Sequence, residues 1–107
     1  GAPTYARDLA QAILQMIKDD QYRQNPGIYN FSNEGVTSWY DFALSIFTWL
    51  DLDCRVTPIR SEAYPTPAKR PAYSVLDKQL FKDTFGQTIP HWQESLWACL
   101  DEGLTAE

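Results

Sequence analysis

The sequence predicts an α+β domain in which about four helices pack on a short two-stranded parallel sheet. Apolar residues recur at helical spacing in several segments, and two short strand-like segments flank one of these helices. The chain has 107 residues, of which 44% are hydrophobic. This length closes one core and is too short for two ordinary domains, so residues 1–107 are expected to form a single domain.

Four segments are predicted to be helical: residues 4–19, 38–50, 74–85 and 90–103. The second has the clearest start, because Ser38 and Asp41 stand three residues apart as in a capping box. Gly86 is placed to terminate the third helix, and Pro90 to open the fourth.

Two segments are predicted to be strands, residues 28–32 and 55–59. Pro58 cannot donate to a strand ladder, which confines the second strand to an edge or an end. Because the predicted helix at 38–50 lies between the two strands, the order favours a right-handed parallel crossover.

The composition argues against several classes of partner. The net charge is −5, and no basic patch suited to a nucleic-acid backbone is present. No apolar run approaches the ~20 residues that cross a bilayer, and no signal peptide is apparent. A cytoplasmic protein that binds neither nucleic acid nor membrane is expected, with Cys54 and Cys99 as reduced core residues.

Catalytic and cofactor motifs are not found. His91 is the only histidine, a glycine-rich dinucleotide fingerprint is missing, and no tyrosine is followed by lysine four positions later. We therefore expect no catalytic, cofactor-binding or metal-binding residue in this chain.

A proline-rich segment at residues 58–71 is the best candidate for binding. It holds four of the seven prolines and no glycine, so its backbone is restricted. It carries three cations, Arg60, Lys69 and Arg70, and one carboxylate, Glu62, so its net charge is positive in an otherwise acidic chain. Arg70 could grip a phosphate bidentately, with Tyr64 nearby as a stacking partner. Composition alone leaves open that these are ordinary loop cations.

The segment at residues 64–76, YPTPAKRPAYSVL, resembles the Pro-x-Pro-Ala-x-Arg-Pro-x-x-Ser-x-Leu signature of dTDP-4-dehydrorhamnose reductases. Other blocks agree with that family in the same order. They are GAPT at 1–4, GIYN at 27–30, SWY at 38–40, Pro58 with Ile59, and Trp92 with Leu96. The resemblance covers nearly the whole chain.

The resemblance implies a place in the extended short-chain dehydrogenase/reductases. In these enzymes an N-terminal Rossmann domain binds NADPH or NADH, and a small C-terminal domain binds the nucleotide sugar. Residues 1–107 look like that second part, a single substrate-binding domain without its Rossmann domain. The intact enzyme is expected to reduce dTDP-4-dehydro-L-rhamnose to dTDP-L-rhamnose, and this fragment alone is expected to be inactive.

The resemblance also assigns site residues and partners. Arg70 is expected to face the diphosphate of the dTDP-sugar, with Lys69, Tyr64 and the Pro3-Thr4 segment as weaker candidates. The expected partners are that sugar nucleotide, the chain's own Rossmann domain and a second copy of the protein in a homo-oligomer. The apolar stripe at residues 39–50 is interpreted as core. A face left apolar and exposed is expected where the Rossmann domain would pack.

Other interpretations remain open at this point. The chain could be the C-terminal domain of a nucleotide-sugar epimerase or dehydratase, or of a non-catalytic regulatory homologue. It could also be a free-standing interaction module.

Overall fold

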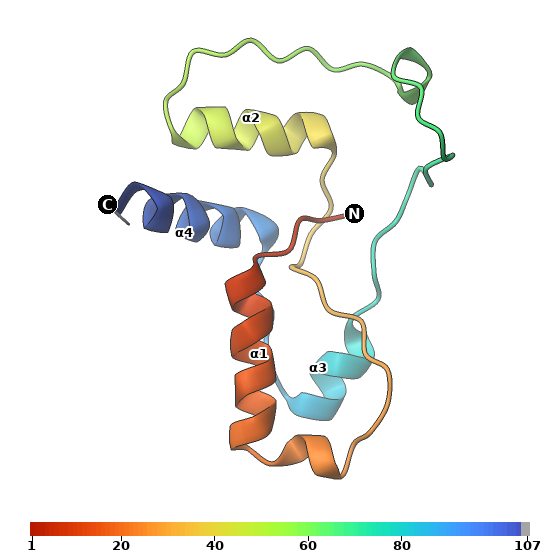
Figure 1. Cartoon of the computed structure of the whole chain (residues 1–107), viewed down its shortest axis with the longest axis vertical. Coiled ribbons are helices and arrows are strands. Elements are labelled where there is room, and N and C mark those ends of the chain that lie inside the picture. Colours follow the sequence, from red (N-terminus) through yellow and green to blue (C-terminus); the bar gives the residue numbers. More distant parts are fainter. Residues whose placement is uncertain (106–107) are drawn as a thin grey trace.

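A computed structural model describes residues 1–105, and these form helices joined by loops. The α-helices are α1 (Ala6–Lys18), α2 (Trp39–Trp49), α3 (Gln79–Phe85) and α4 (Trp92–Thr105). Two short 3-10 turns, η1 (Gln21–Arg23) and η2 (Ser61–Ala63), lie in the connections. Figure 1 shows α2 and α4 side by side, with α1 and α3 forming a second group.

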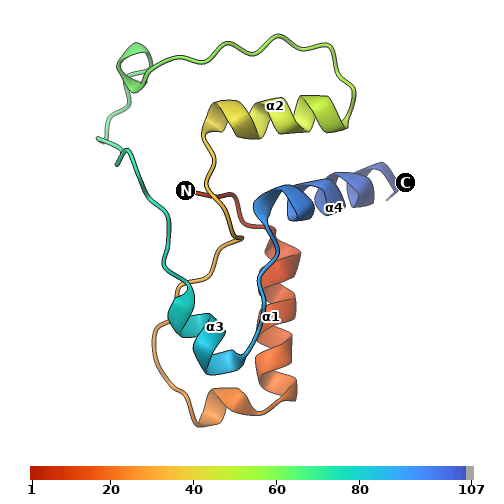
Figure 2. The same cartoon turned by 180° about the vertical axis from the view of Figure 1, so that it is seen from behind.

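The chain is open rather than closed around one centre. From the end of α2 a long loop arches over that helix and returns to α3, and both views show it standing apart from the helices (Figures 1 and 2). The radius of gyration is 16.7 Å, whereas a compact domain of this length has about 13 Å. The four helices therefore do not enclose a common core.

Local sequence signals set two of the helix ends as predicted. The Ser38 hydroxyl accepts the Asp41 N–H at 3.1 Å and donates to the Asp41 carboxylate at 3.0 Å, which caps α2. Gly86 ends α3 with φ of +62°, and its N–H donates to the Lys82 carbonyl at 2.9 Å. The third helix begins later than predicted, at Gln79.

The predicted two-stranded parallel sheet is wrong. Among residues 1–105 the structure contains no strand, and the only parallel pairing is an isolated bridge between Glu34 and His91. The fold class is therefore a set of four helices rather than α+β. The segment at 55–59 belongs to the arching loop on the far side of α2, well away from residues 28–32 (Figure 1).

Residues 28–32, the first expected strand, form no strand because no second strand lies beside them. Tyr29 and Phe31 turn inward and Ile28 is 92% exposed, the alternation of a strand with one covered face. A strand is stabilised by backbone hydrogen bonds to a second strand about 4.8 Å away, and none is present beside this segment in the part described. The side-chain pattern is thus correct while the pairing is missing.

The hydrophobic core is small and lies between α1 and α3. Edge-on aromatic contacts join residues 28–32 to α3, with Tyr29 on Phe85 at 4.9 Å and Phe31 on Phe81 at 5.2 Å between ring centroids. The buried members are Ala12, Phe81, Phe85 and Ile89, with Met16 packed against them. The pair α2 and α4 is held separately, through stacking of Trp49 on Trp97 at 5.1 Å.

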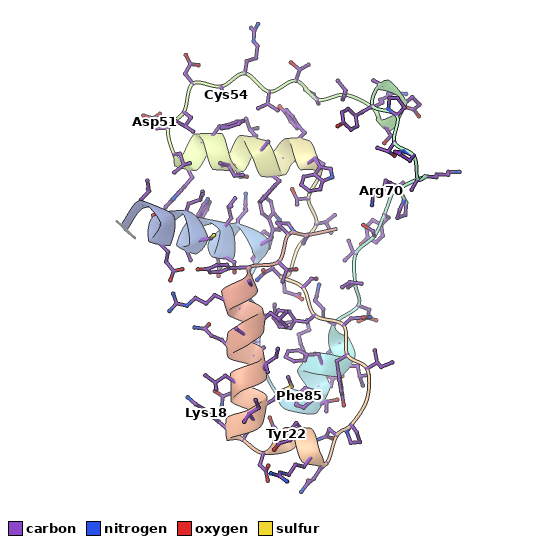
Figure 3. The ribbon with its side chains drawn as sticks, viewed as in Figure 1. Lys18, Tyr22, Asp51, Cys54, Arg70 and Phe85 are labelled. Atoms are coloured by element: carbon purple, nitrogen blue, oxygen red, sulfur yellow. The ribbon has the colours of Figure 1, made fainter. Side chains whose placement is uncertain are left out.

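Two sequence-based core assignments are wrong for this chain. Helix α2 has no fully buried residue, although residues 39–50 were expected to be core. Cys54 and Cys99 are both free, and both are exposed instead of buried. Cys54 lies on the arching loop, as Figure 3 shows. The contacts of α2 with α4 therefore cover its apolar stripe only in part.

Candidate functional site

The candidate site lies on the arching loop, whose shape comes from local bonds and prolines. Around η2 the Ala63 N–H donates to the Arg60 carbonyl at 3.0 Å, and the Tyr64 N–H donates to the Ser61 carbonyl at 3.1 Å. Further on, the Thr66 hydroxyl donates to the Ala68 carbonyl at 2.6 Å. These contacts order the loop without tying it to the helices.

The three predicted binding residues all point into open solvent. Tyr64 is 71% exposed, and Lys69 and Arg70 are also exposed. Arg70 stands on the loop away from every helix (Figure 3). Within residues 1–105 the side chains of Lys69 and Arg70 make no ion pair or hydrogen bond, and no contact joins them to Tyr64. Both cations are free to meet an anion.

The end of the loop returns to the first residues of the chain. Gly1 lies so close to Ser74 that a Cβ on Gly1 would stand 3.2 Å from the Ser74 hydroxyl oxygen. On its other side, the Gly1 carbonyl accepts the Thr37 N–H at 3.0 Å. The structure thus brings the segment containing Pro3 and Thr4 to the loop end that follows Arg70.

Trp39 is a surface residue that the sequence-based prediction missed. It is 86% exposed at the start of α2, and only an edge contact to Phe42 at 6.1 Å between ring centroids supports it. Its neighbours Ser38 and Thr37 lead to the junction with Gly1. The sequence feature that could have predicted this exposure is the position of Trp39 at the first residue of the helix, at the edge of the apolar stripe.

A charged cluster anchors the chain where the loop re-enters the fold. Lys78 is 7% exposed, and its ammonium lies 3.2 Å from the carboxylate of Glu34. Lys82 lies 3.4 Å from the other oxygen of the same carboxylate. Burial raises the pKa of Glu34, but the hydrogen bonds and charges of the two lysines outweigh it and hold that pKa below its ordinary value.

In the described part of the chain, no group of three or more His, Cys, Asp or Glu side chains could hold a metal ion. None of the described helices has the length and apolar character needed to cross a membrane. A hollow of about 460 Å³ is lined by Glu34, Lys82 and residues 86–89. Residues 86–89 directly follow Phe85, the last residue of α3, which Figure 3 shows far from Arg70.

The described chain is a helical domain with an exposed loop that carries Lys69 and Arg70. Its residues 1–105 match the family described as the RmlD substrate binding domain. The chain belongs to this family.

Relatives and a solved structure agree with this assignment. The chain is 37% identical over 106 residues to the spore coat polysaccharide biosynthesis protein SpsK of Bacillus subtilis, covering 99% of the chain and 35% of the relative. It is 32% identical to a dTDP-4-dehydrorhamnose reductase of Burkholderia thailandensis, covering 98% of the chain and 40% of that enzyme.

The crystal structure of a dTDP-4-dehydrorhamnose reductase from Clostridium acetobutylicum matches 94% of the chain with 40% identity and a TM-score of 0.82. The match covers 35% of that protein. The chain therefore spans well under half the length of the relatives it matches.

Proposed function

We propose that this chain is the nucleotide-sugar-binding part of a dTDP-4-dehydrorhamnose reductase. The intact enzyme would reduce dTDP-4-dehydro-L-rhamnose to dTDP-L-rhamnose with NADPH or NADH. The observation that carries the proposal is the family match along residues 1–105, together with relatives of that name. The exposed cationic loop supports it, because a sugar nucleotide carries a diphosphate.

Arg70 is proposed to bind the diphosphate. Its planar guanidinium can donate two parallel hydrogen bonds to phosphate oxygens, and each such charge-assisted bond contributes about 1.5–3 kcal/mol when shielded from water. Lys69 supplies a second positive charge beside it. Tyr64 offers a ring for stacking, and the segment of Pro3 and Thr4 borders the site near the loop end.

The loop is suited to this role because part of the ordering cost is met before the ligand arrives. Four prolines restrict the backbone at residues 58–71. Neither Lys69 nor Arg70 has to give up an ion pair in order to bind. Binding energy is then available for the ligand rather than for breaking internal contacts.

The cofactor and the reacting groups are proposed to come from a Rossmann domain outside this chain. Residues 1–105 provide no glycine fingerprint and no tyrosine–lysine pair for hydride transfer. This agrees with the chain spanning 35–40% of the relatives' length. The enzyme is proposed to work in the cytoplasm, with a second copy as a further partner.

The diphosphate role is tested by Arg70→Ala in the intact protein. We expect dTDP-sugar affinity to fall by about 2 kcal/mol, or thirtyfold, because two charge-assisted hydrogen bonds are lost while water and the neighbouring Lys69 compensate part of that loss. The measurement is isothermal titration calorimetry with dTDP-L-rhamnose, and NAD(P)H affinity should not change. Arg60→Ala is the matched control, because Arg60 is an exposed cation on the same loop. Equal losses in both variants would reject a specific role for Arg70.

The reaction is tested by following NAD(P)H oxidation by the intact protein with enzymatically generated dTDP-4-dehydro-L-rhamnose. Turnover is the expected result. Binding of the sugar nucleotide without turnover would refute the reductase assignment while retaining the binding site.

A further inference from the structure

Helix α1 carries an apolar arc that is wider than this chain can cover. Successive helical residues are about 100° apart, so the apolar side chains from Ala12 round to Leu14 occupy an arc of about 200°. A helix that rests on one surface needs an apolar stripe of little more than 100°. The breadth of the arc indicates that two separate surfaces pack against α1.

This chain supplies only one of those surfaces. Ala12 is 5% exposed and packs with α3, and the neighbouring Met16 contacts the same core. The rest of the arc is uncovered: Leu9 is 39% exposed, Ile13 44%, Leu14 49% and Ile17 55%. Ala6 and Ala10 lie between these residues on the helix and are also exposed.

The chain as a whole, and not only α1, exposes more surface than a compact monomer does, and the excess bears on what covers the arc. The chain exposes 8343 Å², whereas a compact monomer of its 12.3 kDa mass exposes about 6,100 Å². The excess is about 2,200 Å². A dimer contact of standard size covers about 800 Å² on each partner. One such contact leaves most of the excess exposed, whereas a larger domain wrapped on the chain can cover several faces together.

We propose that the outer arc of α1, formed by Leu9, Ile13, Leu14 and Ile17, is the docking surface for the cofactor-binding domain of the same protein. The inference rests on the proposed function, which places that domain outside this chain. The arc has alanines between its larger residues, so another helix or a sheet can approach closely. The arc fits an apolar, tightly packed partner surface.

Thiol labelling of the intact protein tests this proposal. Cys54 and Cys99 are exposed and free, so both are first replaced by serine. Ile13→Cys then places a thiol within the arc, and Gln11→Cys places one on the opposite, polar side of the same helix. Native labelling at position 13 should be at least about a hundredfold slower than at position 11. Both should react at equal rates in denaturant.

Ile17→Cys repeats the measurement should the substitution at position 13 disturb folding. Equal native rates at positions 11 and 13, and at 11 and 17, would overturn the proposal. Protection that disappears on dilution, in step with dissociation of a dimer, would assign the arc to a second copy and also overturn it. Labelling is independent of turnover. Protected thiols in a protein without reductase activity would therefore refute the proposed reaction and leave the docking surface intact.

Discussion

Asn33 is the residue whose loss should damage the fold most. Its side chain is fully buried, with 0% exposure. Its amide oxygen accepts the Tyr5 N–H at 2.8 Å, and its amide nitrogen donates to the Asp8 carboxylate at 2.7 Å. The same nitrogen lies 3.0 Å from the Ser95 hydroxyl and 3.2 Å from the Pro90 carbonyl. Asn33 thus joins the start of α1 to the start of α4.

The expected cost of Asn33→Ala follows from these contacts. The substitution leaves the Tyr5 N–H without its acceptor and removes the donor that faces Asp8. Each buried polar group left unsatisfied costs about 1–3 kcal/mol. We therefore expect the free energy of unfolding to fall by about 3–5 kcal/mol. Such a loss is a large part of the ~5–15 kcal/mol that stabilises a domain.

The assay is denaturant unfolding followed by tryptophan fluorescence. Asn30→Ala is the matched control, because Asn30 is exposed and should change stability by less than about 0.5 kcal/mol. Asn33→Asp keeps the shape of the side chain but replaces the amide donor that faces Asp8 with a second carboxylate, so it should also destabilise the fold at neutral pH. A loss below about 1 kcal/mol for Asn33→Ala would refute the reasoning.

Three further substitutions test the structure, two directly after Asn33 and one at the end of α3. Glu34→Gln should lower the thermal midpoint at neutral pH, because it removes the carboxylate that faces the buried Lys78. The pKa of Glu34 is lowered in the fold, so its stabilising effect is present above its ordinary value of 4.5 and is lost as pH falls. The thermal midpoints of wild type and variant should therefore converge in acid. A difference between the two midpoints that stays constant with pH would contradict a lowered pKa for Glu34. Gly35→Ala should cost more than about 2 kcal/mol by denaturant unfolding, because φ is +98° and a Cβ would lie 2.4 Å from the His91 ring. Gly86→Ala, with φ of +62° and open space around it, should cost only about 1 kcal/mol, and equal losses would argue against a steric cause.

Local signals in the sequence predicted the helices well. The cap at Ser38 and the stop at Gly86 depend on atoms within a few residues of each other, so reading the sequence locally was sufficient. The start of α3 was predicted too early because residues 74–77 follow a proline-rich loop and lack helical hydrogen bonds, the first of which joins the Lys82 N–H to the Lys78 carbonyl. The first residue of a helix that follows a long loop depends on where that loop packs against the rest of the fold, which the local sequence does not show.

The candidate site was located in the sequence, but its surroundings were not. The proline-rich pattern and the excess of cations indicated the loop that carries Arg70, and the structure leaves that side chain exposed. Proximity of Ser74 to Gly1 involves residues more than seventy positions apart, and no periodicity predicts it. Exposure of Trp39 was also missed, because a helical stripe identifies an apolar face without showing what covers it.

The sequence by itself determined where four helices lie, the cap at Ser38, the stop at Gly86 and the family to which this chain belongs, because these depend on local patterns and on motifs along the chain. Tertiary structure decided that residues 28–32 and 55–59 form no sheet, that Asn33 is fully buried, and that one side of α1 stays exposed. Pairing and burial depend on which segments meet in space. Here residues 28–32 pack on α3 but have no second strand beside them, and the outer arc of α1 is uncovered within the part described, so each local pattern lacks the partner that would complete it.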